Sequence, residues 1–237
     1  AAAAVTGMLW TAAMFACFFL TTLYLQQVLG YSPLATGLAF LPMNVLMAVL
    51  SAGAAARLVA RFGTKPPLVG GLLLVATGLA LLAQAPAAGH FATDVLPGAL
   101  LLGTGAGTAV PPLLLAATGD LPPSESGLAS GVVNTAIMLG GALGLAVLAS
   151  LAATRARSLQ AAGHSHLSAL TSGYHIAFLV GAACAACAAL AAAGWLRPAR
   201  PATEPAAAER LAVGTPSHQN PEPSEHLAVG TPSRQDL

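Results

Sequence analysis

Two short motifs carry residue types that are capable of redox or metal chemistry. Cys184 and Cys187 have the spacing of a dithiol redox motif, but they lie inside a long apolar stretch with no basic residue nearby to stabilise a thiolate. His164 and His166 could offer two imidazoles to a metal ion, yet their loop contains no Cys, Asp or Glu to complete a closed site. We therefore interpret the cysteines as packing residues and the histidines as solvated loop residues, and we expect no metal site.

The composition places most of this chain in lipid. Of the 237 residues, 56% are hydrophobic and 7% are charged, whereas a soluble domain carries about a quarter charged residues. Five segments contain no Asp, Glu, Lys or Arg, namely 1–56, 66–93, 95–119, 126–154 and 158–196. Runs of about 18 or more apolar residues are long enough to cross the hydrocarbon core of a membrane as helices. These features exclude a soluble enzyme, a nucleic-acid-binding protein and a disordered protein.

Ionisable groups are missing from the interior of the apolar segments. Asp94 stands at the edge of one of them, and the glycine-rich segment 103–107 has no lysine that would make it a phosphate-binding loop. Intramembrane enzymes and proton relays both need ionisable or metal-ligating groups inside the bundle. We expect no enzymatic activity and no cofactor, and any proton-coupling carboxylate must come from another part of a longer protein.

The apolar segments divide into six membrane-spanning helices at turn signals and charged residues. The predicted spans are 5–28, 34–56, 67–85, 95–117, 124–151 and 173–196. The expected fold class for residues 1–196 is an all-α membrane protein, a bundle of six transmembrane helices. Residues 197–237 are rich in Pro, Glu, Ser and Gln and predict a disordered tail, in which the heptapeptide at 211–217 recurs sixteen residues later at 227–233.

The positions of Lys and Arg predict the orientation. Six spans put the N-terminus, the second and fourth loops and the tail on one side, which carries six cations near the membrane against Arg155 and Arg157 on the other. By the positive-inside rule the first side is cytoplasmic, which predicts a multi-pass membrane protein with a cytoplasmic tail. The chain opens on Ala1 with no basic region before its first span, so we expect it to begin partway through a longer protein.

Five residues are candidates for contact with a substrate. Asn44 and Asn134 lie about ten residues into their spans, where an unpaired amide is costly, so they either hydrogen-bond between helices or face a central cavity. Met14 and Phe18 share one face of the first span and either pack in the core or line a pocket. Thr108, in the fourth span, completes the set.

Two further groups of residues predict helix packing and a gate. Glycines spaced by four residues permit the close approach on which helix association in lipid depends. They are Gly103, Gly107, Gly127, Gly131, Gly140 and Gly144. Arg61 and Lys65 in the second loop could pair with Asp120 or Glu125 in the fourth loop when the cytoplasmic side is closed. Alternatively, the basic loop is solvated and held by lipid headgroups.

Four segments together resemble a known family. Residues 24–42, beginning Tyr-Leu-Gln-Gln, are similar to an outer turn between two spans, and 57–65, Arg-Leu-Val-Ala-Arg-Phe-Gly-Thr-Lys, to a basic cytoplasmic loop. Residues 127–146 are similar to a penultimate helix, and 173–178, Gly-Tyr-His-Ile-Ala-Phe, to the start of a last helix. The family is the major facilitator superfamily, and the resemblance is to the C-terminal six-helix half of its bacterial fourteen-span drug–proton antiporters. Ala60 departs from the pattern, because an acidic residue usually precedes Arg61.

The resemblance implies an architecture and a function. Spans one and four would line a central cavity, two and five would meet an N-terminal half that is missing from this chain, and three and six would face lipid. The chain would be half of a secondary active transporter, exporting small hydrophobic substrates in exchange for protons by alternating access. Its implied partners are the lipid bilayer, that substrate and the N-terminal half. A truncated membrane module or scaffold without transport activity is the alternative.

Overall fold

The computed structural model describes residues 2–118 and 126–195, and every regular element in these ranges is a helix. The elements are α1 (Ala2–Leu23), η1 (Tyr24–Val28), α2 (Pro33–Val49), η2 (Leu50–Ala54), α3 (Ala55–Phe62), α4 (Lys65–Leu82), η3 (Phe91–Val95), α5 (Leu96–Thr118), α6 (Ser126–Ala161) and α7 (His166–Trp195). Within the described residues, six helical stretches are long and apolar enough to cross a membrane. The predicted fold class is confirmed. The tail with its repeat, Asp120 and Glu125 lie outside the described residues.

Local sequence signals set several helix ends. Ser32 caps α2, because its Oγ accepts a hydrogen bond of 3.2 Å from the backbone N–H of Ala35, and Pro33 occupies the first helical position, where no N–H is needed. Gly63, with φ of +80°, ends α3, and Gly163, with φ of +89°, lies in the short connection between α6 and α7. Glycine adopts this left-handed conformation without steric strain.

Two helices extend beyond the predicted spans. α6 continues to Ala161, although its predicted span ends at residue 151, and α7 begins at His166 rather than at residue 173. Hydropathy marks where lipid ends, whereas a helix needs only its internal hydrogen bonds to continue into water. The exposed side chains of Arg155 and Arg157 therefore stand on a helix rather than in a loop.

Three of the six spans contain a turn of π-helix. η1 extends α1, η2 joins α2 to α3, and η3 precedes α5, whereas α4, α7 and the described part of α6 contain none. A π turn inserts an extra residue into the helical repeat, and such turns are frequent at functional sites. The π turns therefore favour α1, α2 and α5 as the helices that carry a functional site.

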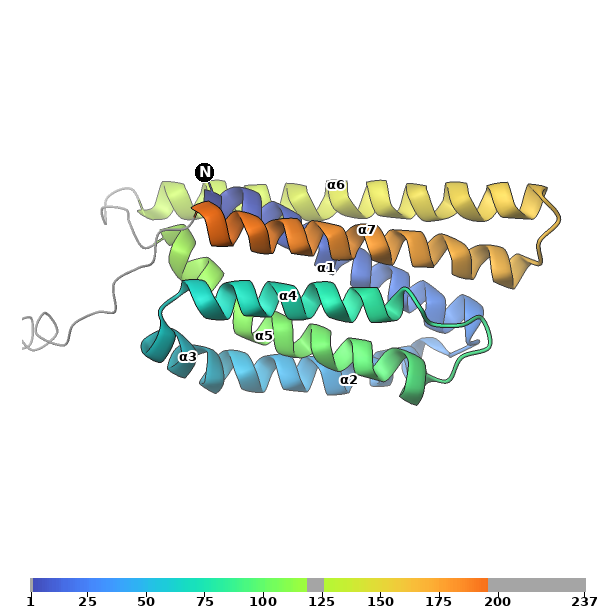
Figure 1. The fold of residues 1–237 in the computed structure, drawn as a ribbon, viewed down its shortest axis with the longest axis horizontal. Coiled ribbons are helices and arrows are strands. Elements are labelled where there is room, and N and C mark those ends of the chain that lie inside the picture. Colours follow the sequence, from blue (N-terminus) through green and yellow to red (C-terminus); the bar gives the residue numbers. More distant parts are fainter. Residues whose placement is uncertain (1, 119–125, 196–237) are drawn as a thin grey trace, which may run out of the picture. The chain divides into compact units, whose positions relative to one another are not determined.

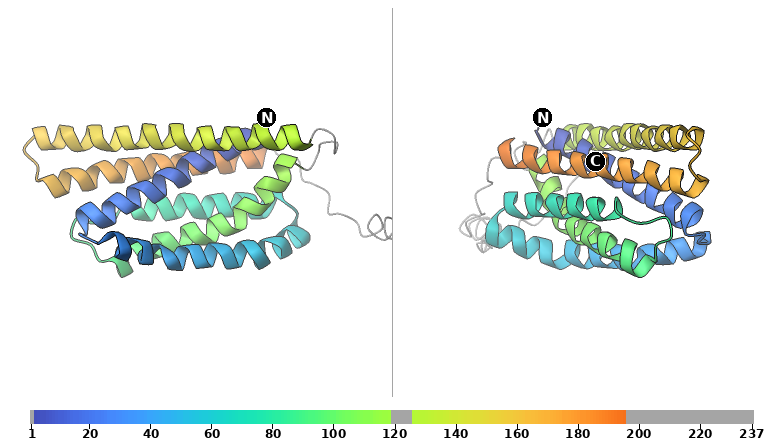
Figure 2. Two further views of the ribbon diagram at one scale, coloured as in Figure 1. Left: turned by 180° about the vertical axis from the view of Figure 1, so that it is seen from behind. Right: turned by 45° about the vertical axis from the view of Figure 1, so that its right-hand side comes forward.

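The helices pack in a partly reciprocal pattern. α1 contacts α6 and α7, and α5 contacts α2 and α4; α7 also contacts α4 and α6, whereas α2 and α4 make no comparable contact. If α1, α2–α3 and α4 are matched in order with α5, α6 and α7, the contacts of α1 with α6 and α7 correspond to the contacts of α5 with α2 and α4. Figure 2 (left) shows α1 and α5 crossing the middle of one face, with α6 and α2 at its edges, whereas α4 and α7 lie in front of them in Figure 1. Two three-helix units thus build the bundle.

Two reciprocal pairs of glycines hold α4 against α5. A Cβ atom at Gly71 would lie 2.7 Å from the carbonyl oxygen of Gly105, and a Cβ at Gly105 would lie 2.5 Å from that of Gly71. Gly78 and Gly98 form the second pair, with corresponding distances of 2.8 and 3.0 Å. The backbones of the two helices are therefore in direct contact, which leaves no room for any side chain.

Candidate functional site

The face formed by α1 and α5 with α2 and α6 at its edges is the candidate site. In the most apolar part of each span, 59% of the residues are buried in the span of α1 and 61% in that of α5, but only 17% in that of α2 and 22% in that of α6. α4 and α7 reach 44% and 39% because they also pack on each other. The central helices are thus supported by the bundle, while both edge helices keep long apolar surfaces uncovered.

The aromatic candidate on α1 reaches an edge helix. Phe18 is half-buried, and its ring centroid lies 5.5 Å from that of Phe40 on α2, with the ring planes tilted by 42°. Met14 is 6% exposed and belongs to the hydrophobic core. The two residues share a helix face, but only Phe18 links α1 to α2.

The polar candidates are placed in different surroundings. Thr108 lies between α5 and α4, where its Oγ1 donates to the carbonyl oxygen of Thr104 at 2.9 Å and would be 2.7 Å from a Cβ at Gly71. It therefore packs against α4 instead of reaching the uncovered face. Asn44 and Asn134 are exposed, and neither side chain has a hydrogen-bond partner within the described chain. Their amides are available to another partner, and among the described residues neither forms a hydrogen bond between helices.

Four of the six predicted packing glycines meet specific neighbours. A Cβ at Gly103 would lie 2.5 Å from the carbonyl oxygen of Met43 on α2, and a Cβ at Gly107 would lie 2.7 Å from that of Met47. On α6, Gly140 faces the backbone of Met8 in α1 at 2.6 Å, and Gly144 faces that of Ala12 at 2.5 Å. These two pairs seat the edge helices on the central helices.

Gly131 is the exception to the predicted packing. A Cβ atom there would meet nothing within 4 Å, so no described residue makes the expected contact, which stays a prediction. The surroundings of Gly127 lie outside the described part of the chain. Glycines spaced by four residues indicate a flat helix face, but the spacing does not reveal whether another helix covers that face.

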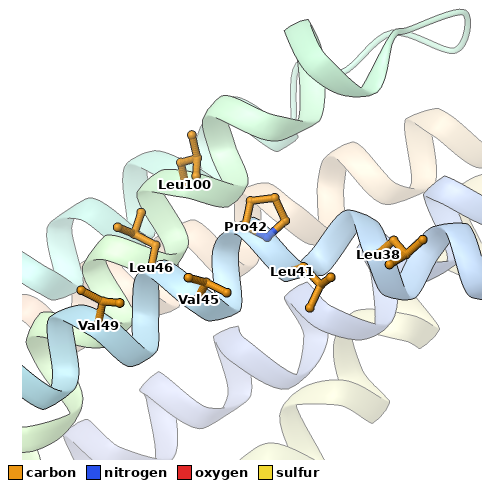
Figure 3. A pocket seen from close by; sticks show the side chains of 7 residues that line it. All are labelled: Leu38, Leu41, Pro42, Val45, Leu46, Val49 and Leu100. Carbon is orange, nitrogen blue, oxygen red and sulfur yellow. The ribbon is translucent and has the colours of Figure 1, made fainter.

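A shallow groove of about 610 Å³ runs along the uncovered side of α2 (Figure 3). It is lined by the side chains of Leu38, Leu41, Pro42, Val45, Leu46, Val49 and, from α5, Leu100. All seven are apolar, so the groove offers shape and hydrophobic contact without a hydrogen bond. Asn44 is one residue from this lining but outside it.

A hydrogen-bonded cluster at one end of the bundle was not predicted from the sequence. Tyr174 Oη on α7 donates to Gln27 Oε1 in η1 at 3.0 Å, and Tyr24 Oη donates to the carbonyl oxygen of Pro86 at 2.7 Å. His175 Nε2 lies 2.7 Å from the carbonyl oxygen of Ala85. We call these four side chains and the two carbonyls the clasp.

The clasp joins segments that are distant in the sequence. It ties the π turn at the end of α1 to the first half of α7 and to the connection between α4 and α5, all at the same end of the bundle (Figure 1). Polar residues inside an apolar segment, such as Tyr174 and His175, were the available signal. Their partners include backbone carbonyls, which no side-chain pattern reveals.

The geometry defines an integral membrane bundle of two three-helix units with one uncovered face. A sequence profile of the Major Facilitator Superfamily matches residues 2–145, and the chain belongs to that family. It is 40% identical over 177 residues to a puromycin resistance protein of Streptomyces alboniger, 34% over 142 residues to a multidrug resistance protein of Mycobacterium tuberculosis, and 38% over 146 residues to a lincomycin resistance protein of Streptomyces lincolnensis.

These alignments cover 71%, 60% and 60% of this chain but only 35%, 26% and 29% of the respective relatives. The chain thus spans about a third or less of the length of the curated relatives it matches. The expected resemblance to drug exporters of this family is confirmed, and the chain is an integral membrane protein.

Proposed function

We propose that this chain is the C-terminal half of a proton-coupled exporter of small hydrophobic molecules in a bacterial cell membrane. The observation that carries the proposal is the uncovered face, on which α2 and α6 are 17% and 22% buried although they belong to a folded bundle. A partner half packed against these edges would enclose the face of α1 and α5 as a central cavity. Rocking of one half against the other would then expose the cavity to alternate sides.

The side chains suit a substrate that is mostly apolar. Phe18 on α1 and Phe40 on α2 form an aromatic pair beside the proposed cavity. The exposed amide of Asn44, also on α2, supplies a polar contact. Such sites bind drug-sized molecules through apolar surface and orient them with a few polar groups. The names of the relatives, which include puromycin and lincomycin resistance proteins, agree with this substrate class.

Proton coupling requires a carboxylate elsewhere. Asp94 is the only carboxylate in the described residues, and it sits in η3, where its Oδ2 accepts a hydrogen bond of 2.7 Å from the backbone N–H of His90. This position is at the end of a span, next to the clasp, and not in the middle of the proposed cavity. The partner half is therefore the expected source of the coupling group.

The chain alone is expected not to transport, because a single half has no partner against which to rock. The test is to reconstitute the purified chain, and separately the product of the whole gene, into vesicles with an imposed proton gradient and to measure uptake of puromycin. Only the whole product should accumulate it, and a proton ionophore should abolish the accumulation. Accumulation by the chain alone would refute the proposal, and inactivity of the whole product on a drug panel would favour the non-transporting module.

A further inference from the structure

Three basic residues at the end of the bundle opposite the clasp have no anionic partner in the described residues. Arg57 and Arg61 are exposed on α3, one helical turn apart, and Lys65 begins α4. No ion pair forms within the described part of the chain, whose one carboxylate, Asp94, follows α4 at its far end. The 18 residues of α4 separate the two ends by about 27 Å, at 1.5 Å per residue. At this distance, screening removes any attraction between them.

The depth of α3 in the membrane follows from the length of the preceding helix. The 17 residues of α2 and the five of η2 rise about 33 Å, slightly more than the thickness of the hydrocarbon core, which is about 30 Å. An upright helix of this length that enters the core at Pro33 leaves it near the start of α3, which brings the eight residues of α3 to the headgroup region. This length allows both arginines to reach the level of the lipid phosphates.

An exposed aromatic residue accompanies the arginines. Phe62, the last residue of α3, is 56% exposed, and the guanidinium carbon of Arg61 lies 5.4 Å from the centre of its ring. An aromatic ring at this depth is accommodated at the boundary of the acyl chains. The cation–π contact holds the guanidinium beside the ring. α3 thus presents an apolar anchor next to two planar cations.

We propose that the exposed face of α3 binds the phosphate of an anionic phospholipid, with Arg57 and Arg61 as the ligands and Phe62 at the acyl boundary. A guanidinium can donate two parallel hydrogen bonds to phosphate, which a lysine ammonium does not match. The spacing of one helical turn allows both arginines to reach one headgroup. Lys65, at the start of the next helix, adds positive charge without being required as a ligand. This site is independent of the proposed transport activity.

The test is a titration of the purified 237-residue chain in nonionic detergent with dioleoylphosphatidylglycerol, followed by native mass spectrometry. The Arg57→Gln/Arg61→Gln variant should bind this lipid about thirtyfold more weakly and each single variant about fivefold, since one basic residue near an anionic surface contributes about 1 kcal/mol. Arg155→Gln/Arg157→Gln, which removes two exposed arginines from the other end of the bundle, is the matched control and should bind like the wild type. Glutamine preserves helix propensity, and circular dichroism verifies the fold.

Other outcomes identify other occupants. Equal weakening by the control pair would overturn the proposal, because lipid binding would then follow net charge alone. Displacement of the lipid by excess inorganic phosphate would overturn it in favour of a free-anion site. Equal affinity for phosphatidylcholine would also overturn it, because the site would then not select an anionic lipid. Binding that appears only after Asp120→Asn/Glu125→Gln would overturn it in favour of the intramolecular ion pair. Selective, arginine-dependent binding that phosphate does not displace supports the lipid site.

Discussion

Replacing Gly71 by leucine is expected to destroy the packing of α4 on α5, whereas the same change at the neighbouring Gly70 leaves the bundle folded. A Cβ at Gly71 would lie 2.7 Å from both the carbonyl oxygen of Gly105 and Oγ1 of Thr108, and 2.9 Å from Cβ of Ala109. At Gly70 it would meet nothing within 4 Å. The two positions have the same residue type in the same helix, so intrinsic helix propensity is matched between the variants.

The expected loss at Gly71 is large because the contact is made by backbone. A leucine would have to separate the two helices, and overpacking of this kind costs about 3 kcal/mol or more. Thermal unfolding in detergent, followed by size-exclusion chromatography, should show Gly71→Leu melting far below the wild type or failing to elute as a single species. Gly70→Leu should elute and melt like the wild type, since leucine is the better helix former. Equal behaviour of the two variants would show that the α4–α5 contact is dispensable.

Substituting His175 by phenylalanine is expected to loosen the clasp. The imidazole is the hydrogen-bond partner of the Ala85 carbonyl at 2.7 Å, and Ala85 is itself only 3% exposed. Phenylalanine keeps the aromatic bulk but leaves this carbonyl unpaired away from water, which costs about 1–3 kcal/mol. The melting temperature should fall by roughly 2–10 °C.

Controls separate the clasp from a general effect of losing a histidine. His164→Phe changes an exposed residue in the connection between α6 and α7 and should leave the melting temperature unchanged. His175→Gln retains a donor and should recover part of the loss. Hydrogen exchange should accelerate at the amides of residues 83–90 in His175→Phe alone. A loss shared equally by His164→Phe, or unchanged exchange in that connection, would contradict the assigned role.

Much of the fold could be predicted because lipid imposes simple rules on a sequence. Backbone groups in the hydrocarbon core must be satisfied internally, so an uncharged apolar run of sufficient length is a helix and the fold class follows. The ends were less predictable, because the helix of α6 continues through Arg155 and Arg157 after the apolar run has stopped. Its termination depends on the turn at Gly163 and not on hydropathy.

The candidate site was less predictable for a related reason. Met14 and Phe18 lie one turn apart on α1, yet Met14 belongs to the core and Phe18 meets Phe40 on the edge helix α2. Thr108 has a polar side chain of the kind expected in a substrate cavity, but it packs against α4. Periodicity places residues on the same face of a helix, and it carries no information about which neighbour covers that face.

The sequence by itself therefore determined that this protein is a bundle of membrane-spanning helices, because the solvent and the length of an apolar run are local properties. Its four motif segments added the resemblance to a transporter family. The tertiary structure alone decided which glycines are in contact, which faces of α2 and α6 stay uncovered, and that the clasp joins Tyr174 to Gln27 and His175 to Ala85. These features depend on pairs of segments brought together by packing. In the connection between α4 and α5, the clasp partners are backbone carbonyls, which every residue possesses.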